Sequence, residues 1–351
     1  ILDFMAQTYS LAYRNNRVIA HSCDTNASTC TFLPRRDFRP NCLSSWGSIG
    51  TTRTYFVASK MASDPRALLQ KAEKAASSAG SGFSLFGGRT EKWENAADLY
   101  TQAANSFRLS KQNKEAGEAF EKAADIQTNK LNEPDDAANT LQEAFKVYRK
   151  EYPQDAARCL DVAVNHYAQK GNLRRAATQK QNLAELYEEV GDMKNALDNY
   201  AVAADWFSGD GAEALANKLF LKVADLAALD GDYYRAIEQY EKVASSSVNN
   251  NLMRYSVKDY LLKSGICLLA VGDIVSIRRA LEKYTDMDPS FHSTREFQLL
   301  ADLTETVEAG DQEAFADKLF KYDQLSKLDK WKTTILLRVK NAIEEKGEDF
   351  S

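Results

Sequence analysis

The sequence predicts an all-α fold in which antiparallel helical hairpins stack into a superhelical layer that ends in a C-terminal helical bundle. Two regularities support this prediction: alanine recurs about every twenty residues, and glycine turns recur about every forty. In addition, the 351 residues include only six prolines and sixteen glycines, which is too few for the many turns of an all-β sandwich or barrel.

Residues 1–60 differ in composition from the rest of the chain. They hold seven basic residues, three aspartates and no glutamate, a net charge of +4 that leaves −9 for residues 61–351. An acid-poor mitochondrial targeting segment is one interpretation. We favour a non-native or disordered upstream extension, because Met61-Ala-Ser-Asp-Pro reads as a native start that leads directly into a helix. Its Asp64 is suited to the N-cap and its Pro65 to the first helical position.

From about residue 93 onward, a pattern of small and large residues repeats every twenty residues and pairs into forty. An alanine four residues before a large apolar residue shares a helix face with it, so the alanine admits a neighbouring helix and the large residue fills the gap. The repeating alanines are Ala96, Ala116, Ala137, Ala156, Ala176, Ala196, Ala216 and Ala236. The unit is tetratricopeptide-like, but its helices are longer than a repeat of about 34 residues allows.

Glycine followed by aspartate or asparagine separates the predicted helices. Glycine ends a helix in the left-handed conformation, and the next side chain caps the following helix. The pairs are Gly171-Asn172, Gly191-Asp192, Gly231-Asp232, Gly272-Asp273 and Gly310-Asp311. Successive glycines of the last four pairs are 40, 41 and 38 residues apart, which indicates a hairpin of two helices as the repeating unit.

The repeat fades toward the C-terminus. Asp288-Pro289 breaks a helix, and residues 325–343 show the pattern of one long amphipathic helix before an acidic tail, residues 344–351. We therefore expect a twisted layer of hairpins over residues 61–285 and a C-terminal helical bundle with an acidic tail over residues 286–351.

The sequence carries no pattern typical of an enzyme or a metal protein. No GxSxG, HExxH or GK[ST] motif occurs, and the three histidines and five cysteines show neither CxxC nor HxxxH spacing. We expect no catalytic residues, no metal and no cofactor. No apolar run approaches the roughly 18 residues of a membrane span. The net charge of −5 argues against generic nucleic-acid binding.

Between the first two predicted helices, the bulky residues Phe83, Leu85 and Phe86 stand between glycines. Such side chains at an exposed loop tip would insert into a partner or a bilayer interface. A buried hydrophobic staple would instead place them beside helix caps. On the residues alone, both interpretations stay open.

Two groups of charged residues also stand out. In the basic group, Lys218 and Lys222 are four residues apart and share a helix face, with a second set one hairpin earlier. The acidic group precedes a bulky residue near the C-terminus. The alternatives are a solvated helix face for the first group and a solubilising tail for the second. The groups are Arg174, Arg175, Lys180, Lys218 and Lys222, and Asp259, Glu305, Glu308, Glu348, Asp349 and Phe350.

Several segments, in order along the chain, resemble those of the soluble NSF attachment proteins, the alpha/beta type and its fungal equivalent. The resemblance covers essentially all of residues 61–351 and none of residues 1–60. The segments are Met61-Ala-Ser-Asp-Pro, Gly82-Phe-Ser-Leu-Phe, Glu94-Asn-Ala-Ala-Asp-Leu-Tyr, Tyr255-Ser-Val-Lys-Asp-Tyr and Leu328-Asp-Lys-Trp-Lys-Thr-Thr-Ile-Leu.

This resemblance implies a non-enzymatic adaptor in vesicle-mediated and ER–Golgi transport. Such a protein would coat the four-helix SNARE bundle, made of syntaxin-type and other SNAREs, and recruit the hexameric AAA ATPase NSF, which unwinds the bundle after membrane fusion. It would be cytoplasmic and peripheral on the cytosolic face of ER, Golgi, vacuole and vesicle membranes. No nucleic acid would take part.

The resemblance also implies roles for individual residues. Lys218 and Lys222 match SNARE-binding lysines, and Arg174, Arg175 and Lys180 lie in the neighbouring basic segment. Phe83, Leu85 and Phe86 match a membrane-contacting loop. On the acidic side, the implied NSF-binding residues are Asp259, Glu305, Glu308 and Phe350. Ala309 stands where a third acid is frequent, and Phe350 replaces the usual penultimate leucine.

A different class of function is a generic tetratricopeptide scaffold that binds peptide tails, such as a chaperone adaptor. Scaffolds of that kind clamp a terminal carboxylate with inward lysine and asparagine on repeats of about 34 residues. The forty-residue period and the glycine-flanked Phe83–Phe86 loop favour the SNARE adaptor.

Overall fold

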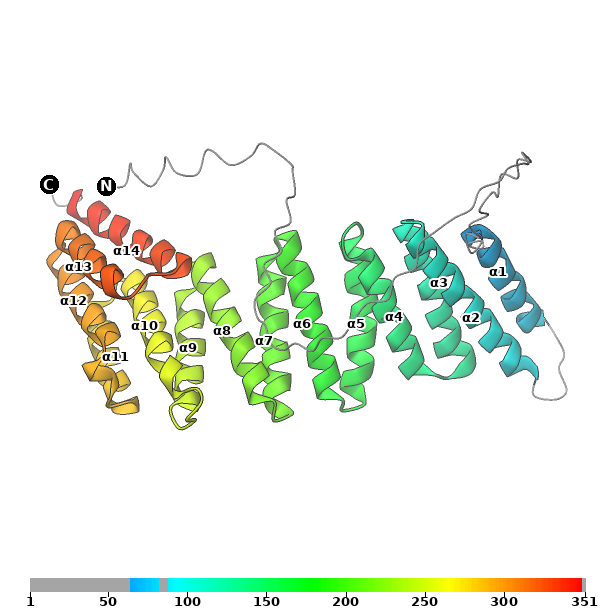
Figure 1. Ribbon diagram of the computed structural model, residues 1–351, viewed down its shortest axis with the longest axis horizontal. Coiled ribbons are helices and arrows are strands. Elements are labelled where there is room, and N and C mark those ends of the chain that lie inside the picture. Colours follow the sequence, from blue (N-terminus) through cyan, green and yellow to red (C-terminus); the bar gives the residue numbers. More distant parts are fainter. Residues whose placement is uncertain (1–63, 82–87, 349–351) are drawn as a thin grey trace, which may run out of the picture. The chain divides into compact units, whose positions relative to one another are not determined.

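The computed structural model describes residues 64–81 and 88–348, so residues 1–60 lie outside the described part of the chain. Within that part every regular element is helical, which confirms the all-α prediction. Figure 1 shows α1 to α10 standing side by side in chain order, each packed against the next. Consecutive helices run antiparallel, as a stack of tetratricopeptide-like hairpins requires.

The first half of the layer consists of α1 (Pro65–Ser81), α2 (Gly88–Leu109), α3 (Asn113–Ile126), α4 (Pro134–Tyr148), α5 (Pro153–Gln169), α6 (Leu173–Val190) and α7 (Met193–Gly209). The chain continues with α8 (Glu213–Asp230), α9 (Tyr233–Ser247), α10 (Arg254–Val271), α11 (Ile274–Met287), α12 (Arg295–Ala309), α13 (Gln312–Leu325) and α14 (Lys330–Glu348). A π-helical turn, Gln127–Leu131, extends α3, and a 3₁₀ turn, Phe291–Ser293, precedes α12.

The turns form as the glycine–acid pairs predict. Gly191 and Gly231 adopt φ of +82° and +97°, the left-handed region that favours glycine. Asp192 and Asp232 each accept a hydrogen bond from a backbone N–H in the first turn of the next helix. Each pair therefore ends one helix and starts the next within two residues.

The repeating alanines form the contact surface between helices. All eight of them, from Ala96 to Ala236, are at most 3% exposed. Because a methyl group is small, helices that meet at an alanine approach closely, and large neighbours such as Tyr200, Phe220 and Tyr240 fill the remaining space.

Ion pairs between helices two apart in the sequence show that the hairpins form two layers. Arg149 of α4 pairs with Glu189 of α6 at 2.8 Å, and Arg158 of α5 pairs with Glu121 of α3 at 2.7 Å. We call α2, α4, α6, α8, α10 and α12 the even layer, and α1, α3, α5, α7, α9 and α11 the odd layer. Pairs of this kind join neighbours of the same layer along most of the stack.

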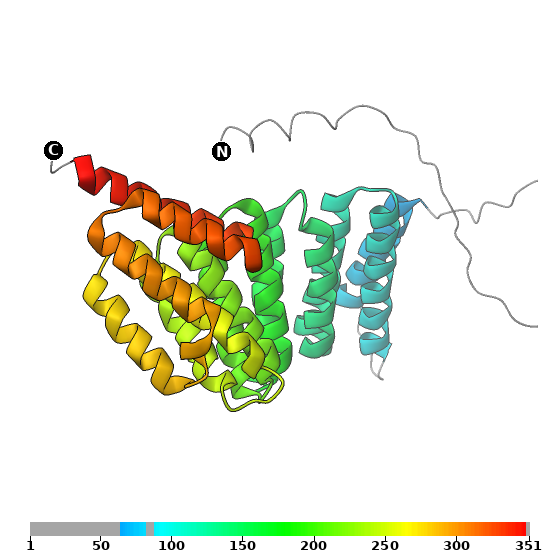
Figure 2. The ribbon, with the colours of Figure 1, turned by 60° about the vertical axis from the view of Figure 1, so that its left-hand side comes forward.

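The last helix, α14, returns across the even layer and packs against α8 and α10 (Figures 1 and 2). The indole N–H of Trp331 donates a hydrogen bond to the backbone carbonyl of Asp225, 2.9 Å away. Arg338 donates to the carbonyl of Leu229 at 2.7 Å. These contacts join residues more than a hundred positions apart and attach the C-terminal helices to the hairpin layer.

Two boundaries expected near the C-terminus are wrong. The long helix expected over residues 325–343 starts later, because α13 ends at Leu325 and α14 begins at Lys330. The Asp323 carboxylate accepts the backbone N–H of Leu328, and the Asp329 carboxylate accepts a backbone N–H in the first turn of α14. These caps stabilise the break. Residues 344–348 of the expected acidic tail belong to α14, which continues to Glu348.

The proposed domain boundary between residues 285 and 286 falls near the end of α11. One apolar core runs from Ala177 to Ile343 and includes residues on both sides of that boundary. The division into a hairpin layer and a C-terminal bundle therefore stays a prediction.

Candidate functional site

Lys218 and Lys222 lie one turn apart on the outward face of α8. The buried residues of this helix, such as Ala216 and Phe220, occupy its opposite side, so the helical register directs both lysines outward. Lys218 is exposed, and no described residue pairs with it. The Nζ of Lys222 lies 2.8 Å from Glu188 Oε1 of α6. The two ammoniums share a face, but within the described part of the chain Lys222 has an ion-pair partner and Lys218 has none.

Arg174 and Arg175 stand in the first turn of α6 and diverge, because adjacent residues of a helix point about 100° apart. Arg174 Nε is 2.9 Å from Asp210 Oδ2, at the connection between α7 and α8. The Arg175 guanidinium lies 5.2 Å from the ring centroid of Tyr167 in α5. The structure thus places Arg174 beside the start of α8 and directs Arg175 toward α5.

Lys180 does not join the other four basic residues. Its Nζ is 2.9 Å from Asn199 Oδ1 of α7 and 3.4 Å from Asp161 Oδ1 of α5, both in the odd layer. Between α5 and α7 the described residues show no ion pair from helix to helix, and Lys180 of the intervening α6 links the two instead. Its position favours a structural role.

We expect Lys180→Met to lower the free energy of unfolding by about 1–2 kcal/mol, because the change removes two hydrogen bonds of a largely buried ammonium. The matched control is Arg174→Met, whose side chain is 61% exposed and should change stability by less than about 0.5 kcal/mol. Urea unfolding followed by circular dichroism measures both. Equal losses in the two variants would contradict the structural role of Lys180.

A row of carboxylates on α6 faces basic residues of the even layer. No pattern in the sequence predicted a role for these carboxylates. Glu189 and Glu185 lie 2.8 and 3.6 Å from the Arg149 guanidinium of α4, and Glu188 lies against Lys222 of α8. The cluster Glu185-Leu-Tyr-Glu188-Glu189 was visible in the sequence, but only the structure shows which basic residue each carboxylate meets.

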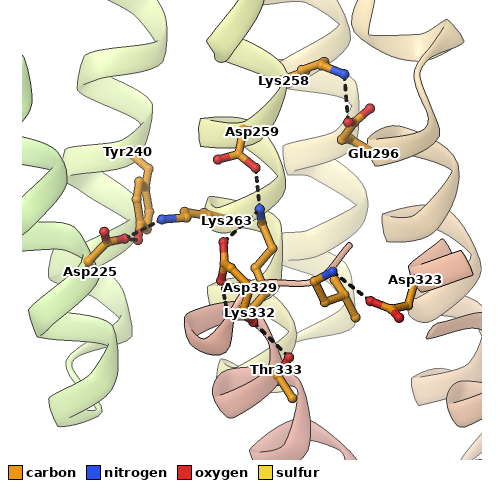
Figure 3. Close-up of polar contacts among 11 residues, drawn as sticks. Asp225, Tyr240, Lys258, Asp259, Lys263, Glu296, Asp323, Asp329, Lys332 and Thr333 are labelled. Carbon is orange, nitrogen blue, oxygen red and sulfur yellow. Dashed lines mark hydrogen bonds and ion pairs between the residues drawn. The ribbon is translucent and has the colours of Figure 1, made fainter. Parts of the chain in front are cut away.

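Asp259 lies in a network of ion pairs that holds the start of α14 against α8 and α10 (Figure 3). Its Oδ1 is 2.5 Å from Lys332 Nζ, which also lies 3.2 Å from Asp329 Oδ2. Beside them, Lys263 Nζ is 2.8 Å from Asp225 Oδ1. The Asp259 carboxylate, in the first turns of α10, is therefore part of an intramolecular ion pair, whereas Glu305 and Glu308 lie on the last turns of α12.

Glu305 and Glu308 lie exposed on the last turns of α12. Glu308 pairs with Arg278 of α11 and lines a groove of about 500 Å³ formed by the C-terminal ends of α10 and α12 and by α14.

Gly272 lines the same groove, so Asp273, the next residue, lies at the border of the groove. Hydrogen bonds from the Ser276 hydroxyl and backbone N–H groups lower the Asp273 pKa and keep the carboxylate ionised.

The sequence pattern indicated only a turn at Asp273. In the structure Asp273 borders the same groove as Glu308, whereas Asp259 belongs to the ion pair with Lys332. The sequence signal that could have found it is the pair of equivalent turns, Gly272-Asp273 and Gly310-Asp311, at the ends of neighbouring helices in one layer. Phe350 and the residues Phe83, Leu85 and Phe86 lie outside the described residues.

Within residues 64–81 and 88–348, no helix is both long and apolar enough to cross a bilayer. The same residues contain no group of three or more potential metal ligands.

The family model and the curated relatives matched by sequence indicate the same family. The model of the soluble NSF attachment protein (SNAP) family matches residues 63–344. A probable vesicular-fusion protein sec17 homolog of Neurospora crassa is 55% identical over 292 residues, which cover 83% of this chain and all of that protein. The homolog of the same name in Schizosaccharomyces pombe is 54% identical over 292 residues, with the same coverage of both chains. The human alpha-soluble NSF attachment protein is 37% identical over 286 residues, 81% of this chain and 96% of that protein.

Proposed function

The chain belongs to the soluble NSF attachment protein family, and we propose that it is an adaptor that binds SNARE complexes and recruits and stimulates the ATPase NSF. SNARE disassembly by this route would serve vesicle fusion and intracellular protein transport. The observation that carries the proposal is the match at 55% identity over the whole length of a vesicular-fusion protein. The role is one of binding, and we assign no catalytic residue.

We place the SNARE-binding surface on the even layer around α8. A SNARE four-helix bundle is acidic outside, so exposed ammoniums attract it and steer its approach. Lys218 and Lys222 supply the central charges, and Arg174 adds a third beside the start of α8. Arg175 points toward α5 and contributes less. Because both partners are charged, binding weakens as salt increases.

We place the NSF-binding surface around Glu305, Glu308 and Asp273. These carboxylates lie on α12 and at the start of α11, around the groove between α10, α12 and α14. Phe350, the penultimate residue of the sequence, would supply an apolar contact to NSF. A basic surface on the ATPase would complement the three carboxylates.

The segment between α1 and α2 would contact the membrane through Phe83, Leu85 and Phe86. Replacing all three with serine should reduce disassembly of membrane-anchored SNARE complexes several-fold and leave soluble complexes unaffected. The reason is that burial of each large apolar side chain contributes about 1.5–3 kcal/mol, enough for three to hold a weak, reversible contact. Disassembly of liposome-anchored and soluble complexes measures the difference, and an equal loss on both would contradict membrane contact.

The whole proposal is tested by reconstitution with the full chain. Immobilised chain should capture a purified SNARE complex, retain NSF only when the complex is present, and release separated SNAREs on addition of ATP and Mg²⁺. Failure to capture the SNARE complex at low salt would overturn the proposed function.

A further inference from the structure

Among the described residues, Glu188 is the carboxylate that pairs with Lys222, one of the two proposed SNARE-binding lysines of α8. Its Oε1 is 2.8 Å from Lys222 Nζ, and its Oε2 accepts a hydrogen bond of 2.8 Å from the hydroxyl of Tyr200. Partial burial opposes ionisation of Glu188, but the hydrogen bonds from Lys222 and Tyr200 outweigh it and lower the pKa of the carboxyl group. Glu188 is therefore ionised and held in place.

The Tyr200 side chain, which holds the Glu188 carboxylate, is rigid. Tyr200 belongs to α7 and is only 3% exposed, so its ring is fixed in the core between the layers. Its hydroxyl positions the Glu188 carboxylate from behind, and Lys222 meets the carboxylate from the neighbouring helix of the same layer. This arrangement differs from a surface glutamate that finds a lysine by chance, because a buried donor restricts one of its two oxygens.

We infer that Glu188 is an internal counter-ion that competes with an acidic partner for Lys222 and thereby sets the affinity of the even layer for that partner. The inference rests on the proposed function and names a residue that tunes it. A carboxylate of the partner would take the place of Glu188 Oε1 at the Lys222 ammonium. Lys218, which pairs with none of the described residues, would contact the partner without any such exchange.

The exchange is feasible because the pair is partly exposed. The Lys222 and Glu188 side chains retain 40% and 31% of their accessible surface, and solvent-screened ion pairs are weak. A partner that presents several carboxylates in a row can therefore displace Glu188 from Lys222, whereas a single free carboxylate gains little. Glu188 thus favours extended acidic surfaces over isolated acidic groups.

The adjacent residue provides a matched control. Glu189 lies on the same helix and the same layer, but it pairs with Arg149 of α4, away from Lys222. Glu188→Gln and Glu189→Gln each remove one negative charge from α6. Glutamine at position 188 keeps an oxygen that can accept a hydrogen bond from the Tyr200 hydroxyl, so this hydrogen bond remains while the charge opposite Lys222 disappears.

The experiment measures binding of a purified acidic SNARE complex to the full chain at about 0.1 M and about 0.5 M salt. Glu188→Gln should bind about two- to fivefold more tightly at the lower salt, and Glu189→Gln less than about 1.5-fold. The difference should shrink at the higher salt because the charges are screened. In a Lys222→Gln background, the gain from Glu188→Gln should disappear.

Tighter binding of Glu188→Gln alone, lost at higher salt and in the Lys222→Gln background, supports Glu188 as the counter-ion. Equal gains in Glu188→Gln and Glu189→Gln would reduce the effect to net charge, and no gain in either would show that Glu188 does not compete; both overturn the inference while the proposed function stands. If the parent chain does not bind the SNARE complex at all, the proposed function fails, and the inference fails with it. Circular dichroism of each variant checks that its helices are intact.

Discussion

Lys218→Glu combined with Lys222→Glu should weaken binding to a SNARE complex at least about thirtyfold at low salt, a loss of about 2 kcal/mol or more. Both side chains point outward from α8, so reversal replaces attraction with repulsion along an acidic bundle without disturbing the core. Reversal also places a glutamate at position 222 against Glu188, which adds local repulsion on the same face. Binding is measured by titration of fluorescent SNARE complex.

The matched control is Lys71→Glu with Lys74→Glu. These two exposed lysines share one face of α1 in the odd layer, and their reversal changes the net charge of the chain by the same amount. The control pair should retain binding within about threefold, because only long-range repulsion changes. Equal losses in both double variants, or unchanged binding of the Lys218/Lys222 pair, would contradict the assignment of the even layer.

Gly117→Ala should destabilise the N-terminal hairpins by about 1–3 kcal/mol or more, although alanine is ordinarily the better helix former. A Cβ at position 117 would lie 2.1 Å from Cζ of Tyr148, with two further ring atoms at 2.4 and 2.5 Å. The ring cannot retreat easily, because Tyr148 is only 1% exposed and its hydroxyl donates to Glu121. Either α3 and α4 separate or the ring leaves its position.

Thermal and urea unfolding followed by circular dichroism measure this loss, with Gly80→Ala as the control. A Cβ at Gly80, near the end of α1, meets no atom of the described residues within 4 Å, so that variant should be neutral or slightly more stable. Tyr148→Leu should reduce the effect of Gly117→Ala, since the smaller side chain leaves room for the methyl group. Additive losses in the double variant would contradict direct contact between positions 117 and 148.

The fold follows closely from the sequence because its signals are local. A glycine in the left-handed conformation, an adjacent capping aspartate and an alanine four residues before a large side chain all act within one or two helical turns. Turns such as Gly191-Asp192 and buried alanines such as Ala196 therefore appear where the pattern predicts them. The error at the start of the last helix has the same origin, since apolar periodicity concealed the two aspartates that cap the connection between α13 and α14.

The candidate sites were predictable only in part. The register of α8 fixes the outward direction of Lys218 and Lys222, because the buried face of a helix determines its exposed face. The same reasoning fails for Lys180, whose position on α6 does not reveal that its ammonium reaches between α5 and α7. It also fails for Asp259, which meets Lys332 from 73 positions away.

By itself, the sequence determined the helices, the hairpin turns, the alanine contacts and the family to which the chain belongs. Only the tertiary structure decided which charges remain available to a partner: Lys222 faces Glu188, Asp259 faces Lys332, and Lys218 meets no charged group among the described residues. The reason is physical. Helical order is set by interactions a few residues apart, whereas an ion pair between layers or between neighbouring hairpins depends on how far each helix is shifted and rotated against the next. Those offsets arise from the packing of the whole core.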